Sequence, residues 1–237
     1  MLQAVWAHSP DLRKAKNTIA NYVEAMTRAT PPRVAVLSSV GANRTSGLGM
    51  ITALSLLAQG LRHLTLPIAY VRAGGFFRNF LYGLHVAHGG TPPVFYNATS
   101  RKSTMVATDD IGAEVARPLG GPVWSGHRVV ELGSMISADE VAAQLGKVLQ
   151  RDVKAFAIPR AGWPAAFEQF DVPKGQTGPA EAMFDAVVGH RKDIARGRRA
   201  RHVLRTRYAE IHPAGVDLHR VNWPGANPST LVAVPLA

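Results

Sequence analysis

The chain has 237 residues, of which 46% are hydrophobic and 18% are charged, a composition typical of a globular protein with a substantial core. No apolar run approaches the roughly 18 residues that a membrane-spanning helix needs, and the first residues lack the pattern of a secretion signal. The absence of cysteine excludes disulfides, thiol catalysis and thiolate metal sites, and it agrees with a cytoplasmic protein. No membrane partner is expected, because no apolar run is long enough to span a bilayer.

The formal net charge of +11 is concentrated in one segment. Residues 191–208, RKDIARGRRARHVLRTRY, contain eight arginines or lysines and one aspartate, which contribute +7 of that charge. A basic segment of this kind can bind a nucleic-acid backbone, although such runs are more often solvated surface. No aromatic residues interleave with the arginines as they do in proteins that bind single strands. Nucleic-acid binding therefore stays an alternative.

The first third of the chain alternates helix and strand patterns. Ser9-Pro10 predicts a helix start, and apolar residues then recur at helical spacing until Pro31-Pro32. The segment 33–39, RVAVLSS, is typical of a buried strand; a loop with three glycines and an amphipathic helix over 48–61 follow. Another buried strand is predicted over 67–74. This order indicates an α/β fold with a right-handed parallel sheet.

The rest of the chain continues with weaker patterns. Ser137 and Glu140 form a capping box that predicts a helix over 138–149, and Ile136 and Val141 are placed for a hydrophobic staple. The sequence from 213 to the end is rich in proline, glycine and asparagine and is predicted to be an irregular tail. The other predicted elements are strands over 103–108, 127–132 and 153–159, a helix from Asp110 to Arg117 that ends at Pro118, and helices near 163–170 and 179–190.

The three glycines after the first buried strand, Gly41, Gly47 and Gly49, raise the question of a phosphate-binding loop. A dinucleotide fingerprint has the spacing G-x-G-x-x-G, with an acidic residue about 20 positions later. The spacing here is different, and Gly74-Gly75, Gly89-Gly90 and Gly120-Gly121 are isolated pairs. We therefore interpret the loop as the rim of a site whose phosphate end is bound elsewhere.

Four blocks in a fixed order resemble the NmrA-like family, which are atypical short-chain dehydrogenases/reductases. They are RVAVLSSVGA, LPIAYVRAGGFFRNF, MVATDDIGAEVA and HRVVELGSMISADEVAAQL, and the resemblance extends over about residues 4–210. It implies a Rossmann-like parallel sheet that binds NADP or NAD. It also implies that the chain begins near the family's fourth strand and lacks a glycine-rich segment of about 60–80 residues. The sheet would then be N-terminally incomplete.

The resemblance also implies a division of the chain and a set of cofactor contacts. We expect a partial dinucleotide-binding domain over 1–132, a small C-terminal α/β lobe on the substrate side over 133–212, and the tail over 213–237. Ala73 and Arg78 depart from the family's R-P-x-x-F-x-E-N block, in which proline and glutamate stand at these positions. The residues expected to line the nicotinamide end of the cofactor site are Ser38, Ser39, Val40, Gly41, Arg72, Gly74, Phe76 and Asn79.

No catalytic residue is predicted. None of the five tyrosines is followed four positions later by lysine, so the Y-x-x-x-K pair of typical dehydrogenases is absent, and so is the G-x-S-x-G motif of hydrolases. Asp110 is expected to cap a helix, and His85 and His88 have no third ligand at metal-binding spacing. The sequence predicts an oxidoreductase-like protein that uses a quinone or similar small acceptor. The alternative is a non-catalytic NAD(P) redox-sensing regulator that contacts protein or nucleic acid.

Overall fold

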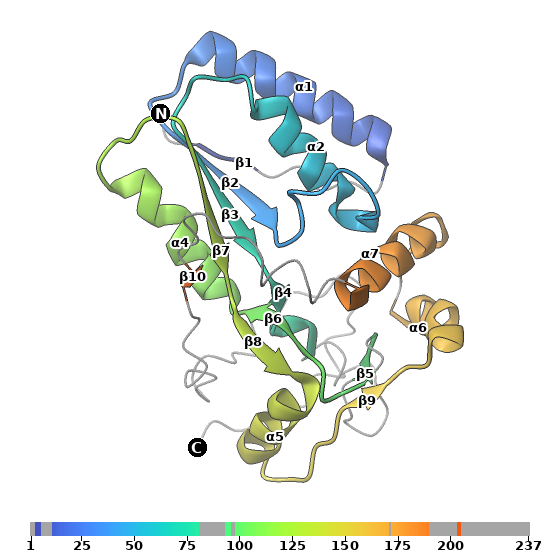
Figure 1. Cartoon of the computed structure of the whole chain (residues 1–237). Coiled ribbons are helices and arrows are strands. Elements are labelled where there is room, and N and C mark those ends of the chain that lie inside the picture. The colour runs from blue at the N-terminus through green and yellow to red at the C-terminus, as the bar shows by residue number, and fades with distance from the viewer. Residues whose placement is uncertain are drawn as a thin grey trace, which may run out of the picture.

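A computed structural model describes residues 3–5, 11–80, 93–95, 98–170, 172–189 and 203–204 of the chain. At its centre lies a five-stranded sheet, parallel throughout, in the order β1-β2-β3-β7-β10 (Figure 1). The predicted α/β class with a Rossmann-like parallel sheet is confirmed. The strands are β1 (Gln3–Val5), β2 (Val34–Ser39), β3 (Ile68–Ala73), β7 (His127–Leu132) and β10 (Val203–Leu204).

Helices cover both faces of this sheet (Figure 1). Helices α1 (Leu12–Ala29) and α2 (Thr52–Leu61) pack on one face, and α4 (Thr108–Gly120) packs on the other. Alternate residues of a strand point to opposite faces, so the register decides which side chains share a core. The core under α1 and α2 consists of Ile19, Met26, Val34, Val36, Leu57, Leu61, Ile68 and Tyr70. The core under α4 consists of Val71, Ala73, Val106, Ile111 and Leu132.

Two helix boundaries differ from the prediction. Helix α1 begins at Leu12, and its N-cap is Asp11, whose carboxylate accepts hydrogen bonds from the backbone amides of Arg13 at 2.9 Å and Lys14 at 3.2 Å. The prediction from Ser9-Pro10 placed this start too early, and those two residues lie outside the described part of the chain.

Helix α4 continues through Pro118 to Gly120, so the expected stop at this proline is wrong. The proline lies in the last turn, where its missing amide removes one hydrogen bond, and Arg33 donates to the carbonyls of Pro118 and Gly121. The expected capping role of Asp110 is also wrong. The N-cap is Ala107, and Asp110 lies in the first turn, where its charge favours the helix dipole.

A smaller sheet continues from the ends of β3 and β7. It contains β4 (Gly75–Phe76), β6 (Lys102–Val106) and β8 (Ser134–Ser137), in that order, and helix α5 (Ala138–Leu149) packs on it. The predicted capping box is confirmed: the amide of Glu140 donates to Oγ of Ser137 at 3.2 Å, and the Glu140 carboxylate accepts from the Ser137 amide at 2.7 Å. Ile136 and Val141 both lie in the core under α5, as the staple requires.

The segment after α5 forms a short strand pair and two helices. Strands β5 (Pro93–Val94) and β9 (Phe156–Ala157) pair in parallel, and β9 is shorter than the strand predicted over 153–159. Helices α6 (Trp163–Gln169) and α7 (Thr177–Gly189) follow, and they lie on the α1–α2 side of the molecule (Figure 1). Their aromatic core consists of Phe95, Trp163, Phe167 and Phe184, with ring centroids 4.7 to 6.3 Å apart.

Several predictions fall on residues that the structure does not describe. His85, His88 and the tail over 213–237 are among them, as is the basic segment 191–208 apart from Val203 and Leu204. These two residues form β10, so part of the basic segment pairs with the edge of the main sheet at β7. Among the described helices, none is long and apolar enough to cross a membrane.

Candidate functional site

Polar side chains form one row across the carboxyl ends of three neighbouring strands. The register pairs Ser38 of β2 with Arg72 of β3, and Arg72 with Glu131 of β7. Paired residues of a parallel sheet share a face, and this is the face on which Val36 and Tyr70 pack against α1 and α2. We call Ser38, Arg72 and Glu131 the strand-end row. Ligands of open α/β sheets bind at this edge.

Two members of the strand-end row form an ion pair that is largely shielded from water. Nη1 of Arg72 lies 3.8 Å from Oε1 of Glu131, and their side chains are 15% and 12% exposed. The opposite charges cancel, so the row carries no net charge. A charge buried to this extent would be costly without its partner.

Ser38 is the third member of the row, and its hydroxyl has an unusual environment. The residue is 4% exposed, and its Oγ has no hydrogen-bond partner among the described residues. Buried hydroxyls are nearly always hydrogen-bonded in folded proteins, because an unpaired polar group loses its bonds to water without replacement. The neighbouring Ser39 differs, since its Oγ donates to the carbonyl of Val40 at 3.1 Å.

The loop between β2 and α2 is ordered by hydrogen bonds along its length. The amide of Val40 donates to the carbonyl of Ala73 at 3.0 Å, which ties the start of the loop to β3. Within the loop, Ala42 donates to Ser39 at 3.0 Å and Arg44 donates to Gly41 at 3.1 Å. The buried hydroxyl of Ser55 in α2 donates to the carbonyl of Arg44 at 2.5 Å. These hydrogen bonds define the shape of the loop.

The three glycines of this loop have different roles. Gly41 has a φ of +92° and Gly47 a φ of +67°, conformations that favour glycine, and a β-carbon on either would meet no atom of the described residues within 4 Å. Gly41, three residues after Ser38, is therefore not a packing position among the described elements. Gly49, at φ +51°, has the opposite environment: a β-carbon there would overlap the backbone of α7 at Pro179 and Met183. The third glycine is a packing position for this helix.

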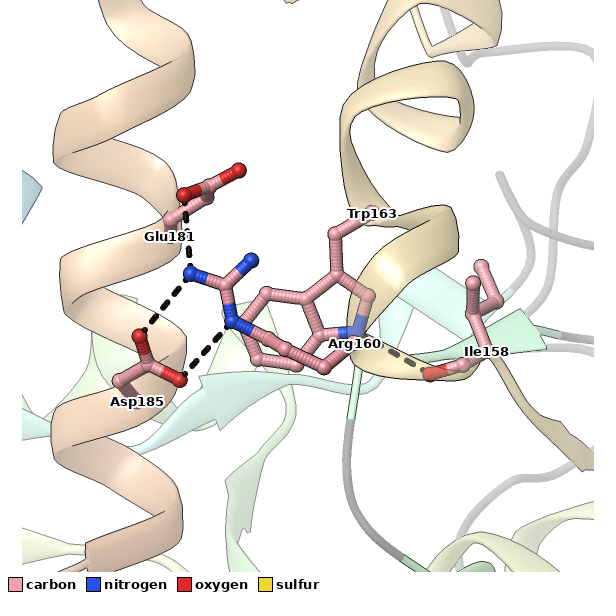
Figure 2. A network of polar contacts seen from close by, with 5 residues as sticks. All are labelled: Ile158, Arg160, Trp163, Glu181 and Asp185. Carbon is pink, nitrogen blue, oxygen red and sulfur yellow. Dashed lines mark hydrogen bonds and ion pairs between the residues drawn. The ribbon is translucent and has the colours of Figure 1, made fainter.

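Helix α7 is held beside α6 by one arginine (Figure 2). Arg160, in a short 3-10 turn before α6, donates to Glu181 at 2.8 Å and to Asp185 at 3.2 and 3.3 Å. Its guanidinium lies over the indole ring of Trp163, 4.4 Å from the ring centroid. The indole N–H donates to the carbonyl of Ile158 at 3.0 Å. Helix α7 is therefore connected to α6 through Arg160 and to the loop between β2 and α2 through Gly49.

Gly74, one of the expected cofactor contacts, lies where β3 passes from the large sheet to the small one. A β-carbon on Gly74 would lie 2.5 Å from the carbonyl oxygen of Thr104 in β6. Gly133, at the equivalent crossing from β7 to β8, would place a β-carbon 2.6 Å from Cγ2 of the same Thr104. The close approach of β6 accounts for both glycines.

The remaining expected contacts are spread over two environments. Phe76 in β4 is partly buried and packs on the core under α4, on the opposite face from the strand-end row. Asn79 is exposed just after β4, as is its neighbour Arg78. The structure thus brings Ser38 and Arg72 together in the strand-end row, and Val40 and Gly41 follow at the end of β2, with Gly74 at the adjoining crossing. Ser39 is paired with Ala73, so its side chain lies on the opposite face of the sheet, toward α4. Phe76 and Asn79 do not join the strand-end row.

Glu131 was not identified from the sequence, although a signal exists. It is the charged residue in the strand pattern HRVVEL, next to the buried Leu132. A charge close to the end of a buried strand indicates a partner on a neighbouring strand, but only the register identifies that partner as Arg72.

Tyr70 lies two residues before Arg72 on the same face. Burial raises the pKa of Tyr70 to about 12, while the positive charge of Arg72 acts in the opposite direction. The ring of His127 meets the Tyr70 ring edge-on, with centroids 5.8 Å apart. Tyr70 therefore remains a neutral phenol at physiological pH. In the described part of the chain, no three histidine, aspartate or glutamate side chains are grouped so as to hold a metal ion.

Comparisons with known proteins place this geometry in context. No family model matches the sequence, and no curated protein matches it. Solved structures do match. An NADPH-dependent quinone oxidoreductase from Escherichia coli, complexed with NADPH, has a TM-score of 0.63 at 23% identity, over 79% of this chain and 65% of its own.

Two further structures match at lower identity. A nucleoside-diphosphate-sugar epimerase from Staphylococcus aureus has a TM-score of 0.61 at 18% identity, over 79% of this chain and 67% of its own. NmrA, a negative transcriptional regulator in complex with NAD, has a TM-score of 0.55 at 18% identity, over 80% of this chain and 61% of its own. The chain thus spans about two thirds of the length of these proteins. The resemblance to the NmrA-like family is confirmed at the level of the fold, and the chain has the Rossmann-type fold that NmrA, the reductase and the epimerase share.

Proposed function

We propose that the chain binds the nicotinamide end of NADP or NAD at the carboxyl ends of β2 and β3. The observation that carries this proposal is the strand-end row, in which a buried serine hydroxyl with no hydrogen-bond partner among the described residues lies beside an ion pair at the edge where such sheets bind ligands. The structural neighbours in complex with NADPH or NAD support the choice of ligand.

The residues at this edge fit one end of a dinucleotide. Ser38 and Arg72 supply polar groups on one face of the sheet, and at Gly41 an added β-carbon would meet no atom of the described residues within 4 Å. The 237 residues contain no G-x-G-x-x-G fingerprint, so the contacts assigned here concern the nicotinamide end alone. A bound reduced nicotinamide supplies a hydride, and this chain would orient the ring and exclude water from it.

We further propose an oxidoreductase-like function with a quinone or a similar small acceptor, in the cytoplasm as the cysteine-free sequence suggests. The Y-x-x-x-K pair is absent, so positioning of donor and acceptor would take the place of a catalytic acid. The acceptor would enter beside the lobe that follows residue 132, whose helix α7 packs on the glycine loop. Support comes from the quinone oxidoreductase of similar fold.

Binding and turnover are tested separately. Calorimetric titration with NADPH and NADH measures binding, and loss of absorbance at 340 nm with a quinone measures turnover. Gly41→Asn adds a side chain at the end of β2, where we propose that the ligand binds, and should weaken binding about tenfold or more. Gly47→Asn is the matched control, because it has the same kind of backbone conformation and open surroundings further along the loop. Equal effects of the two variants would contradict the site, and an absence of dinucleotide binding would contradict the function.

A regulator that binds the dinucleotide without turnover is the second candidate. The observations that favour it are the similarity in fold to NmrA and the absence of the tyrosine–lysine pair. It would act through protein or nucleic-acid contacts of the basic segment 191–208. The expected result is dinucleotide binding without quinone-dependent oxidation, together with salt-dependent DNA binding that is lost when Arg198, Arg199 and Arg201 are replaced by alanine.

A further inference from the structure

We propose that the strand-end row recognises a neutral primary carboxamide, and that Glu131 is the residue that rejects a carboxylate at the same position. This inference rests on the proposed function, because the carboxamide in question is that of the nicotinamide ring. It adds the chemical group that is recognised and a specificity-determining residue on a third strand, β7.

The argument starts from the hydroxyl of Ser38. It is buried at 4% exposure, it lacks a hydrogen-bond partner among the described residues, and it lies on the same face as Arg72. A hydroxyl both donates and accepts, so it is satisfied best by a group that does both. Gly41, where an added β-carbon would meet no atom of the described residues within 4 Å, follows three residues further along the chain.

The second step concerns charge. Arg72 and Glu131 lie side by side in the register, with 3.8 Å between their nearest charged atoms, and both are mostly buried. A site with one cation and one anion has no net attraction for an anionic ligand. An added carboxylate would place two negative groups near one guanidinium in surroundings that screen charge poorly. A neutral polar group avoids this cost.

The third step compares the candidate groups. A primary carboxamide has a carbonyl that accepts and an NH2 that donates, so it complements a row with a guanidinium, a hydroxyl and a carboxylate. A methyl ketone of the same shape keeps the acceptor and loses the donor. A carboxylate has two acceptor oxygens and no donor, and it adds a negative charge beside Glu131. A comparison of the affinities for these three groups therefore distinguishes the contribution of hydrogen bonding from that of charge.

Three dinucleotides provide these groups on one scaffold: NAD, its 3-acetylpyridine analogue and nicotinic acid adenine dinucleotide. Calorimetry measures the affinity of each for the whole chain, for Ser38→Ala, for Glu131→Gln and for Ser125→Ala. The last is a control at the exposed amino end of β7. The wild type should bind NAD about fivefold more tightly than the ketone analogue and at least about tenfold more tightly than the acid.

Ser38→Ala and Glu131→Gln should each change one of these ratios. Ser38→Ala should reduce the preference for NAD over the ketone to less than about twofold, because the hydroxyl no longer meets the amide. Glu131→Gln should remove or reverse the preference for NAD over the acid, because the negative charge that repels the carboxylate is removed from the strand-end row. Ser125→Ala should leave both ratios unchanged.

The outcomes distinguish the two levels of the proposal. If NAD binds but Ser38→Ala leaves the ketone ratio unchanged, the carboxamide assignment is wrong and the dinucleotide site stands. If none of the three compounds binds, the proposed function fails and this inference fails with it. Circular dichroism establishes which variants are folded. Should Glu131→Gln unfold because the ion pair with Arg72 is lost, Ser38→Ala still decides the assignment.

Discussion

Gly49 lies against helix α7 so closely that a β-carbon at this position would overlap the carbonyl oxygen of Pro179. The contact connects the loop after β2 with a helix that lies about 130 residues later in the sequence. Met50, the next residue, packs on the aromatic core of α6 and α7. The rim of the candidate site and the C-terminal helices therefore form one packed unit.

Replacement of Gly49 by alanine should lower the free energy of unfolding by about 2–4 kcal/mol. The substitution adds a backbone strain at φ +51° and forces α7 away from the loop. Gly112→Ala is the control, because Gly112 is exposed in α4 and has no atom within 4 Å of the added carbon; it should leave stability unchanged or raise it by up to about 1 kcal/mol. Urea denaturation measures both. Equal stability of Gly49→Ala and the wild type would contradict the packing of α7 on the loop.

Replacement of two buried serines by alanine should have different effects on the free energy of unfolding. Ser55→Ala removes the hydrogen bond to the carbonyl of Arg44 and should lower the free energy of unfolding by about 1–2 kcal/mol. Ser38→Ala removes a hydroxyl with no partner among the described residues, so stability should stay the same or rise slightly. Thermal unfolding of the two variants makes the comparison. A clear loss of stability in Ser38→Ala would show that its hydroxyl already has a structural partner.

Arg160 should stabilise the contact between α6 and α7 in a salt-dependent manner. Arg160→Ala removes the ion pairs with Glu181 and Asp185 and the stacking on Trp163, so the melting temperature should fall (Figure 2). Arg160→Lys should recover only part of the loss, since lysine keeps the charge but lacks the planar group. The difference between wild type and Arg160→Ala should shrink as salt rises from low concentration to 1 M.

The control for this measurement is Arg28→Ala. Arg28 pairs with Glu24 on the surface of α1, where the two side chains are 80% and 67% exposed, and such pairs contribute little. Arg160→Ala should therefore lower the melting temperature more than Arg28→Ala does. If the two variants behave alike, the stacked network has no special role.

The raised pKa of Tyr70 predicts that the folded protein loses stability at high pH. Its pKa in the folded protein is raised to about 12 by burial, whereas an unfolded tyrosine titrates at about 10. The unfolded chain therefore loses this proton first, and the contribution is fully present below pH 10 and lost as the pH rises through 12. Tyr70→Phe should flatten the decline of stability between pH 10 and 12. Urea denaturation across this range measures it, and identical slopes for the two proteins would contradict the raised pKa.

The sequence by itself determined the local elements and their order. Alternating strand and helix patterns are a property of neighbouring residues, so β2, β3, β7 and the α5 capping box could be located from spacing alone. The carboxyl ends of parallel strands share one edge, so Ser38 and Arg72 could be placed near each other before any coordinates existed. Helix boundaries were less accurate, because caps such as Asp11 compete with neighbouring candidates.

Only the tertiary structure decided which groups meet. The partnership of Arg72 with Glu131 depends on a register between strands about 60 residues apart, and no local pattern encodes it. The three glycines after β2 look alike in the sequence, yet a β-carbon on Gly41 would meet no atom of the described residues within 4 Å, whereas Gly49 contacts α7. The reason is physical: spacing along the chain reports which face a residue occupies, whereas the neighbour on that face is decided by how distant elements pack.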